Sequence, residues 1–142
     1  MRLVEFVVAG KPLAKARVRF TKSGHVFTPG KTVAYEGQLA FAAQQAMDGR
    51  PPVSGPVAVT LEVHLPVAAS WPAKKRQAAL SGTLRPTGRP DLDNFAKMLD
   101  ALNLVVWNDD SQIVELCVFK RYSPSPQMAV TVDLLDSNGI AV

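Results

Sequence analysis

The spacing of apolar residues predicts four main strands along the 142-residue chain. Residues 2–10 form a β-branched apolar run closed by a glycine, which is typical of a buried strand. Residues 57–66 alternate apolar and polar side chains. Residues 110–123 predict a central strand, and residues 127–136 predict another after a short Ser-Pro loop.

Helical spacing of apolar residues predicts a helix over residues 32–47, with a threonine in capping position. A shorter helix is expected over residues 70–80, with a serine near its cap and a proline in its first turn. Residues 16–30 alternate arginine with apolar residues before a K-S-G-H turn, which predicts a hairpin with arginines on one face. We therefore expect a single α+β domain over residues 1–142, with a mainly antiparallel or mixed sheet flanked by two to three helices.

One further helix is expected to begin within D-L-D-N-F-A-K-M-L-D-A-L, residues 91–102. Its apolar residues at spacings of three and four form the expected buried stripe: Leu92, Phe95, Leu99 and Leu102. Asp93, Lys97 and Asp100 fall on a different stripe and should point together away from the core. Asp91 lies beside Asp93, just before the helix or in its first turn.

Charge is distributed unevenly along this basic protein, whose formal net charge is +4 from 16 Lys and Arg against 12 Asp and Glu. Residues 91–110 hold five acids and one base, a net charge of −4, so the rest of the chain carries +8. A basic protein suits a polyanionic partner. An acidic cluster within it indicates a cation site, although an ordinary basic protein with a capped helix would show the same totals.

The acids of this region can converge, because the segment L-N-L-V-V-W is long enough to return Asp109 and Asp110 to the helix start. Neighbouring carboxylates repel each other unless they share a cation. Three or four carboxylates with one lysine can hold Mg²⁺, which prefers oxygen ligands and can activate water against a phosphate. Lys97 could stabilise the developing charge or orient the nucleophile. An isolated D-x-D at a helix start is more often a cap, so the hypothesis of a metal site depends on its combination with Lys97, Asp109 and Asp110.

The sequence gives little support for other catalytic chemistries. The two histidines and Cys117 lack zinc-ligand spacing, and no nucleophile triad or glycine-rich phosphate loop is present. The single cysteine, set in an apolar run, is expected to be a buried inert thiol. No apolar run approaches the roughly 20 residues that span a bilayer, and the segment after Met1 is too short and mixed for a signal peptide, so we expect a cytoplasmic protein.

Basic residues gather in two segments that favour contacts with phosphate. Six bases and no acid lie between Glu5 and Glu36, whereas isolated surface lysines are usually only solvated. The residues predicted to contact the phosphates of a polyanionic partner are Lys15, Arg17, Arg19, Lys22, Lys74, Lys75, Arg76 and Arg89. Trp71 could stack on a base or pack under a loop, and the sequence leaves both open.

Two segments, RPDLDNFAKMLDAL and VWNDDSQIVELCVFKRY, resemble the RusA family of Holliday junction resolvases, and the N-terminal GKPLAKARVRF and TPGKTVAYE resemble its phage and prophage branch. The family signature combines a D-L-D-N helix start, a lysine one turn later, D-A-L, and D-D-x-Q before a strand ending in lysine. The matching positions here are Asp91 to Asn94, Lys97, Asp100 to Leu102, Asp109, Asp110, Gln112 and Lys120. One departure is L-N-L-V-V-W, where many relatives have a glycine before the tryptophan position.

The resemblance implies a RusA-like fold and a Mg²⁺-dependent endodeoxyribonuclease, with Mn²⁺ able to replace Mg²⁺. It would resolve four-way DNA junctions by paired phosphodiester hydrolysis, in recombination and repair. The resemblance places catalytic roles on Asp91, Asp93, Asp110 and Lys97, with the three aspartates as metal ligands. The implied partners are branched double-stranded DNA and a second copy of the chain, without membrane or nucleotide cofactor. Sheet edges or the 33–47 helix could form the dimer interface.

Three other functions compete with this one. A PD-(D/E)xK nuclease would need E-x-K on the following strand, but Glu115 and Lys120 have the wrong spacing. A D-x-D phosphatase of the haloacid dehalogenase type would need an apolar strand running into Asp91, and T-G-R-P stands there instead. A non-catalytic DNA-binding module with a structural cation site is the alternative from a different class, and metal-dependent cleavage would distinguish it.

Overall fold

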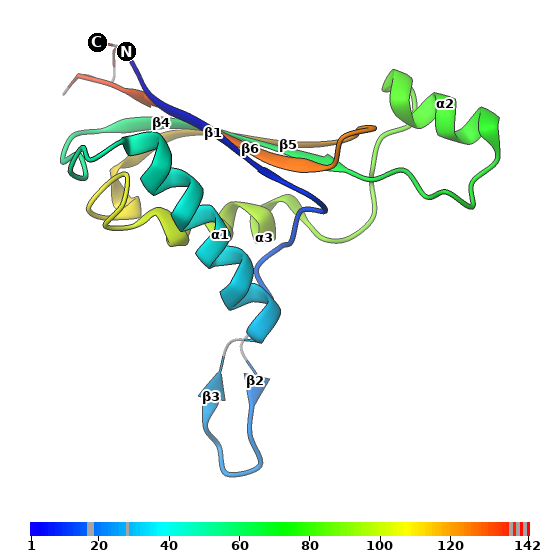
Figure 1. Ribbon diagram of the computed structural model, residues 1–142, viewed down its shortest axis with the longest axis horizontal. Helices are drawn as coiled ribbons and strands as arrows, with labels where there is room; N and C mark the ends of the chain where they lie inside the picture. Colours follow the sequence, from blue (N-terminus) through cyan, green and yellow to red (C-terminus); the bar gives the residue numbers. More distant parts are fainter. Residues whose placement is uncertain (17–18, 28, 137, 139, 141) are drawn as a thin grey trace.

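A computed structural model describes residues 1–16, 19–27, 29–136, 138, 140 and 142, and places helices beneath one sheet (Figure 1). Arg17 and two neighbouring hairpin positions, 18 and 28, lie outside the described residues. The elements are β1 (Arg2–Ala9), β2 (Arg19–Phe20), β3 (Val26–Phe27), α1 (Gly30–Met47), β4 (Val57–Leu65), α2 (Ala73–Ser81), α3 (Leu92–Ala96), the 3₁₀ helices η1 (Lys97–Leu102) and η2 (Asp110–Gln112), β5 (Ile113–Tyr122) and β6 (Gln127–Leu134).

The sheet is mixed and has the strand order β1-β6-β4-β5. β6 pairs antiparallel with β1 and β4, whereas β5 pairs parallel with β4. The expected α+β class with a mixed, mainly antiparallel sheet is therefore confirmed. The expected central position of residues 110–123 is wrong, because β5 is an edge strand and β6 lies inside the sheet.

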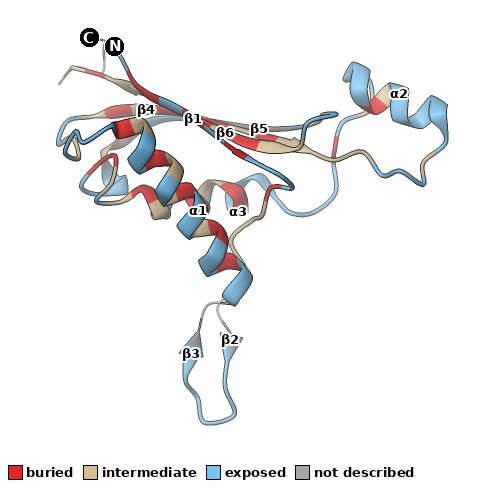
Figure 2. Ribbon diagram, in the orientation of Figure 1, coloured by how far each residue is buried: buried red, intermediate tan, exposed pale blue. Residues whose placement is uncertain are grey.

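The core lies between the sheet and the layer formed by α1, α3 and η1 (Figures 1 and 2). Alternate residues of β4 face this layer and are buried, as the alternation of residues 57–66 predicts. Leu39 of α1, Leu61 of β4 and Phe95 of α3 each expose 1% or less of their surface. Burial of side chains of this size stabilises the fold by about 1.5–3 kcal/mol each, so the core fixes α3 against the sheet.

Helix caps differ from those expected. α1 begins after Pro29, and Thr32 is buried inside the helix instead of capping it. α2 begins after Pro72, without a side-chain cap from Ser70. Proline suits the start of a helix because its missing N–H would have no intrahelical partner there, so proline rather than a hydroxyl side chain marks both starts.

Two projections leave the body of the molecule (Figure 1). The β2–β3 hairpin extends from the start of α1, as residues 16–30 predict. α2 stands at the end of a second projection, beyond the ends of β4 and β5. Among the described residues, no helix is long and apolar enough to cross a membrane.

Candidate active site

The acidic segment begins where the loop before α3 enters the helix. Asp91 is the N-cap residue, and its carbonyl accepts hydrogen bonds from the N–H groups of Asn94 (3.1 Å) and Phe95 (3.4 Å). Its side chain makes no cap bond, which leaves the Asp91 carboxylate exposed. Phe95 is fully buried and anchors this turn, whereas Leu92 is 37% exposed and does not belong to the buried stripe, contrary to expectation.

The helix changes character after Ala96. The sequence predicts one amphipathic helix, but the chain tightens into the 3₁₀ helix η1 from Lys97 to Leu102. A 3₁₀ helix has about three residues per turn, so residues three apart lie in line. Lys97 and Asp100 therefore share one side, while Met98, Leu99 and Leu102 are buried.

Asp93 and Lys97 form an exposed ion pair across one turn. Lys97 Nζ lies 3.9 Å from Asp93 Oδ2 and donates to Asn94 Oδ1 at 3.5 Å. The Asp93 and Lys97 side chains are 70% and 59% exposed. Pairs this exposed contribute at most about 1 kcal/mol to stability, so both groups stay available to an anionic ligand or a cation. The sequence prediction that they point together away from the core is confirmed.

The return segment brings the second acidic cluster back to η1. Trp107 is fully buried, and its Nε1–H donates to Asn103 Oδ1 at 2.7 Å. Leu104 adopts a left-handed conformation with φ 66°, where a side chain costs about 1–2 kcal/mol relative to glycine. Glycine would be favoured in this conformation. Leu104 lies in L-N-L-V-V-W, the segment where the sequence departs from the RusA pattern.

Asp109 and Asp110, adjacent in sequence, have different surroundings. Asp109 is the N-cap of η2, where its Oδ2 accepts from the Ser111 N–H at 3.1 Å, and this hydrogen bond lowers the pKa of Asp109. Gln112 completes the capping box by accepting from the Asn108 and Asp109 N–H groups, both at 2.9 Å. The side chain of Asp110 takes no part in the capping box and faces Asp100 of η1.

Asp100 and Asp110 meet where η1 and η2 face each other. Partial burial raises the pKa of Asp100, and so do hydrogen bonding to Asp110 and repulsion from it. Lys15 lowers this pKa and Glu36 raises it, which places both near Asp100. The carboxyl pair borders a hollow of about 360 Å³ lined by Ala96, Lys97, Leu99, Asp100, Asp110, Ile113, Val114 and Leu116.

This donor set suits a magnesium ion in part. Across the described ranges, no three His, Cys, Asp or Glu side chains meet closely enough to hold a metal by themselves. Mg²⁺ usually keeps several waters and binds through one or two carboxylates plus the phosphates of its substrate. The Asp100–Asp110 pair fits that mode, and a cation there would offset the repulsion between the two carboxylates. The ligand roles expected of Asp91, Asp93 and Asp110 stay predictions.

Asp100 is the residue whose importance the sequence prediction missed. The stripe of Asp93, Lys97 and Asp100 is visible in the sequence, yet no ligand role was expected of Asp100. The sequence signal for Asp100 is its spacing of three residues from Lys97, which places the two side chains on one side of the helix. The contact with Asp110 depends on the path of the return segment, which no local pattern specifies.

We predict that Asp100→Asn stabilises the protein at neutral pH in the absence of divalent cations. The folded-state pKa of Asp100 is raised, so its protonated form contributes stability below its unfolded pKa, near 3.9. That contribution is lost as pH rises through the folded pKa. The expected gain for the variant is less than about 1 kcal/mol, because solvent screens a largely exposed pair. Thermal unfolding in chelator from acidic to neutral pH measures it.

Asp109→Asn provides a control of opposite sign, because the pKa of Asp109 is lowered. Its contribution is present above the unfolded pKa and is lost as pH falls through the folded pKa. The Asp109 variant should therefore be less stable than the wild type at neutral pH. Equal pH profiles for wild type and Asp100→Asn would contradict the proposed repulsion between Asp100 and Asp110.

Lys120 of β5 fixes the loop that leads into Asp91. Its Nζ donates to the carbonyls of Gly88 (2.7 Å) and Pro90 (2.9 Å). These carbonyls belong to the loop just before the N-cap residue Asp91, so Lys120 fixes the position of the Asp91 backbone. The sequence suggested this lysine only as part of the family signature, without a structural role.

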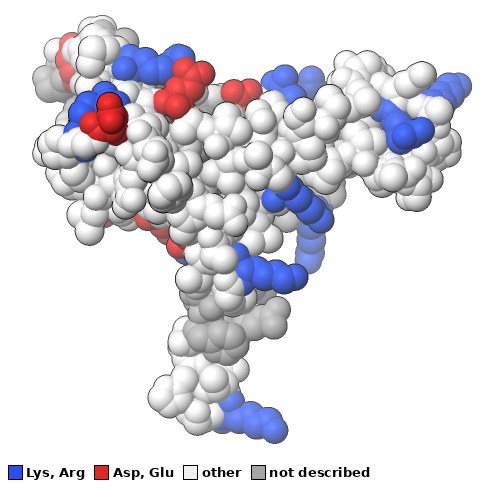
Figure 3. Space-filling model, viewed as in Figure 1, with Lys and Arg blue, Asp and Glu red and all other residues white. Residues whose placement is uncertain are grey.

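The predicted DNA-binding residues divide between the two projections. Figure 3 shows basic side chains on the hairpin projection and at α2. Lys22 is exposed in the hairpin turn. The structure describes the backbone of Arg19 but not its side chain, and Arg17 lies outside the described residues. Lys15 is held in an ion pair with Glu36 at 2.7 Å, and its N–H donates to the Asn94 carbonyl at 2.9 Å. Lys15 therefore anchors the base of the hairpin beside α3.

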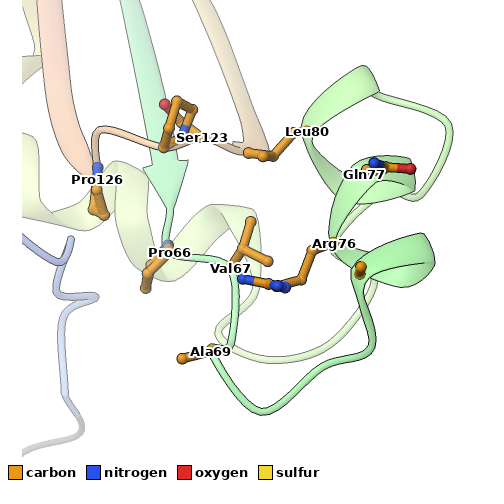
Figure 4. A pocket seen from close by; sticks show the side chains of 10 residues that line it. Pro66, Val67, Ala69, Arg76, Gln77, Leu80, Ser123 and Pro126 are labelled. Atoms are coloured by element: carbon orange, nitrogen blue, oxygen red, sulfur yellow. The ribbon is translucent and has the colours of Figure 1, made fainter.

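On the second projection, Lys74 is exposed and Arg89 is exposed in the loop before α3. Lys75 Nζ lies 4.1 Å from the centre of the Trp71 ring. Trp71 packs edge-on against Tyr122, with ring centres 5.4 Å apart, so packing is the role that the structure shows for it. Figure 4 shows Arg76 in a second hollow of about 500 Å³ beneath α2.

Comparison with known proteins places this chain in a family. The family described as endodeoxyribonuclease RusA matches residues 9–133, nearly the whole chain. A protein of Bacillus subtilis (strain 168), named YqaN and described as uncharacterized, is 37% identical over 140 residues, covering 93% of this chain and 96% of the relative. The class is that of DNA-cutting hydrolases, and this chain belongs to the RusA endodeoxyribonuclease family.

Proposed function

We propose that the protein is a Mg²⁺-dependent, structure-selective endodeoxyribonuclease that resolves four-way DNA junctions. The observation that carries the proposal is the contact of Asp100 with Asp110 beside Lys97, in a chain of the RusA family. Carboxylates brought together in this way need a cation or a proton, and a phosphodiester under attack needs charge stabilisation. We further propose that the protein acts in the cytoplasm, in DNA recombination and repair.

The roles follow from position. Asp91, Asp93 and Asp110 are proposed metal ligands, with Asp100 completing the acidic surface around Asp110. A bound Mg²⁺ would supply an activated water and neutralise phosphate charge. Lys97, paired only weakly with Asp93, can move its ammonium toward a scissile phosphate. Lys120 acts through the loop and positions Asp91 rather than touching the substrate.

The basic projections explain how a phosphate backbone could reach this acidic surface. The hairpin is tied to α3 through the Lys15–Asn94 backbone hydrogen bond. α2 stands on the second projection, away from the hairpin (Figure 1), and Arg89 belongs to the loop that runs from α2 into Asp91. DNA arms held by both projections would place a backbone between them, which favours a branched substrate over a linear one.

Cleavage of a labelled synthetic four-way junction tests the proposal, with linear duplex of the same sequence as control. We expect cleavage of the junction with Mg²⁺ or Mn²⁺, little of the duplex, and none in chelator. Equal cleavage of junction and duplex would contradict structure selectivity. Tight junction binding without cleavage under any divalent cation would instead support a non-catalytic DNA-binding module.

We predict that the double variant Arg17→Ala, Arg19→Ala weakens binding to all DNA forms. For each phosphate that the variant no longer neutralises, the slope of log affinity against log salt should fall by about one unit. Arg2→Ala is the matched control, because Arg2 pairs with Glu5 and Asp133 at the far end of the sheet. Fluorescence anisotropy at several salt concentrations measures the slope, and an unchanged slope would reduce both arginines to solvated surface residues.

We predict that Lys120→Met lowers the cleavage rate by roughly 10- to 100-fold, because small misplacements of catalytic groups have effects of this size. Junction affinity should change little, since Lys120 Nζ is engaged with protein carbonyls. Lys120→Arg should restore part of the rate by donating to the same carbonyls. Single-turnover cleavage separates the two parameters, and an unaffected rate in the Met variant would remove the positioning role.

A further inference from the structure

The helix α2 stands apart from the core. Of its nine residues only Ala79 is buried, so the helix adds little to the stability of the fold. Lys75 of α2 lies over the Trp71 ring, and Trp71 packs edge-on against Tyr122 at the end of β5. These contacts hold α2 beyond the ends of β4 and β5 (Figure 1). A helix that is held in place without joining the core is expected to serve binding rather than folding.

The hollow beneath α2 has a mostly apolar lining. Its walls come from the segment after β4, the turn between β5 and β6, and α2 itself (Figure 4). The larger apolar side chains of these walls are Pro66, Val67, Leu80 and Pro126. Among the described residues that line the hollow, only Arg76 is charged, and its side chain extends from α2 toward Val67 (Figure 4). The volume of about 500 Å³ suits a small ligand, and this lining suits one with an apolar face and a negative charge.

The segments around this hollow carry no acidic residue. Residues 63–90 contain five Lys and Arg and no acid, and residues 116–132 contain two Lys and Arg and no acid. Arg76 is exposed, and within the described part of the chain it forms no ion pair. Because no acid nearby neutralises these cations, they favour an anionic ligand from outside the chain.

We propose that the hollow beneath α2 binds one unstacked nucleotide of a DNA strand, with its base against the apolar wall and its phosphate at Arg76. The inference rests on the proposed function, because that function makes DNA the anionic partner. A nucleotide has both of the required parts, a flat base and an attached phosphate. Duplex DNA offers phosphates but keeps the faces of its bases stacked, so only an opened strand can place a base in the hollow.

This contact would contribute to substrate choice. Taking a base out of an intact duplex costs stacking and pairing energy, and that cost is least where stacking or pairing is already interrupted. Branched DNA has such an interruption at its branch point, whereas linear duplex has none away from its ends. The hollow would therefore favour branched DNA through binding alone, without the catalytic acids.

Two other features of the surface belong to sites already described. A neighbouring hollow of about 320 Å³ shares Leu80 and is lined by Lys120, which is engaged with the loop before Asp91. The exposed Val114 and Leu116 of β5 line the hollow of the acidic pair. The hollow beneath α2 is separate from both, since it shares no lining residue with the acidic hollow and does not include Lys120.

Binding of two single strands separates contact with the base from contact with the phosphate. One probe is a labelled oligothymidine, and the other is a strand of the same length with abasic residues. Leu80→Ser should lower affinity for oligothymidine by about ten-fold and leave affinity for the abasic strand unchanged, because it removes apolar surface and no charge. Val7→Ser on β1 is the matched control, since Val7 and Leu80 are each 47% exposed. Fluorescence anisotropy in chelator measures both affinities.

Arg76→Ala is compared with Lys74→Ala, which removes the same charge from α2 outside the hollow. Lys74→Ala should weaken binding of the two strands by the same factor. Arg76→Ala should weaken binding of oligothymidine about five-fold more than binding of the abasic strand, because the phosphate then no longer holds the base over the apolar wall. Equal factors for Arg76→Ala, together with no selective loss in Leu80→Ser, would overturn the inference.

Titration of isotope-labelled protein with thymidine 5′-monophosphate locates the contact. The amide resonances of Val67, Arg76, Leu80 and Ser123, which line the hollow, should shift, and deoxyribose 5-phosphate at the same concentration should shift them much less. Cleavage is not measured, and the abasic strand reports DNA binding as such, so failure of this inference is distinct from failure of the nuclease proposal. Equal shifts with both phosphates would overturn the inference in favour of a plain anion site. Shifts with an acidic peptide but not with the nucleotide would overturn it in favour of a protein partner.

Discussion

Asp91→Asn, Asp93→Asn and Asp110→Asn are each expected to abolish junction cleavage while leaving junction binding intact or tighter. Loss of a metal ligand removes several kcal/mol of transition-state stabilisation, and about 4 kcal/mol corresponds to a thousand-fold loss in rate. Asparagine keeps the size of each side chain, so the fold should persist. Binding should strengthen because a negative charge that repels phosphate has been removed.

Asp48→Asn is the matched control for these three variants. Asp48 is an exposed C-cap residue of α1 in the left-handed conformation, which asparagine tolerates. Rates are compared in single-turnover cleavage with Mg²⁺, and affinities in chelator. Near wild-type cleavage by any one of the three would show that its carboxylate is not a ligand. A parallel loss in Asp48→Asn would indicate a general effect of charge.

Mixed dimers of wild-type and Asp93→Asn chains should cut only one strand of each junction. We propose that each chain supplies one set of catalytic residues, and productive resolution needs two cuts in symmetrically related strands. Random mixing makes heterodimers the commonest species. On a four-way junction extruded in supercoiled plasmid, paired cuts give linear product and single cuts give nicked circles.

The expected result is therefore a shift from linear product to nicked circles as the inactive chain is added. Wild type mixed with Asp48→Asn chains should keep the linear product and serves as the control. A monomer in solution that remains a monomer on the junction would contradict the two-site account. The amount of linear product could instead fall in proportion to the share of active chain, with no nicked circles. That result would show that the chains do not exchange or do not act in pairs.

Sequence patterns predicted the elements of the sheet well, because period-two alternation depends on burial of one face. The buried residues of β4 follow that alternation closely. The patterns misplaced β5, since an apolar run at an unprotected edge looks like a buried strand. Cys117 was wrongly assigned to the core for the same reason.

The acidic site could be predicted as a set of residues but not as a geometry. Asp93 and Lys97 meet because their spacing is local to one helical turn. The contact of Asp100 with Asp110 needs the change to a 3₁₀ helix and the left-handed turn at Leu104, neither of which follows from local propensity. The different environments of Asp109 and Asp110 likewise depend on the capping box that Gln112 completes.

The acidic cluster of this basic protein is a proposed divalent-cation site, and localisation of the cation tests that most directly. Isotope-labelled protein titrated with Mn²⁺ would be followed by paramagnetic broadening of its amide resonances. Broadening should be strongest around Asp91, Asp93, Asp100 and Asp110, should be reversed by excess Mg²⁺, and should be lost in Asp110→Asn. Broadening centred elsewhere, or unchanged in Asp110→Asn, would contradict the account.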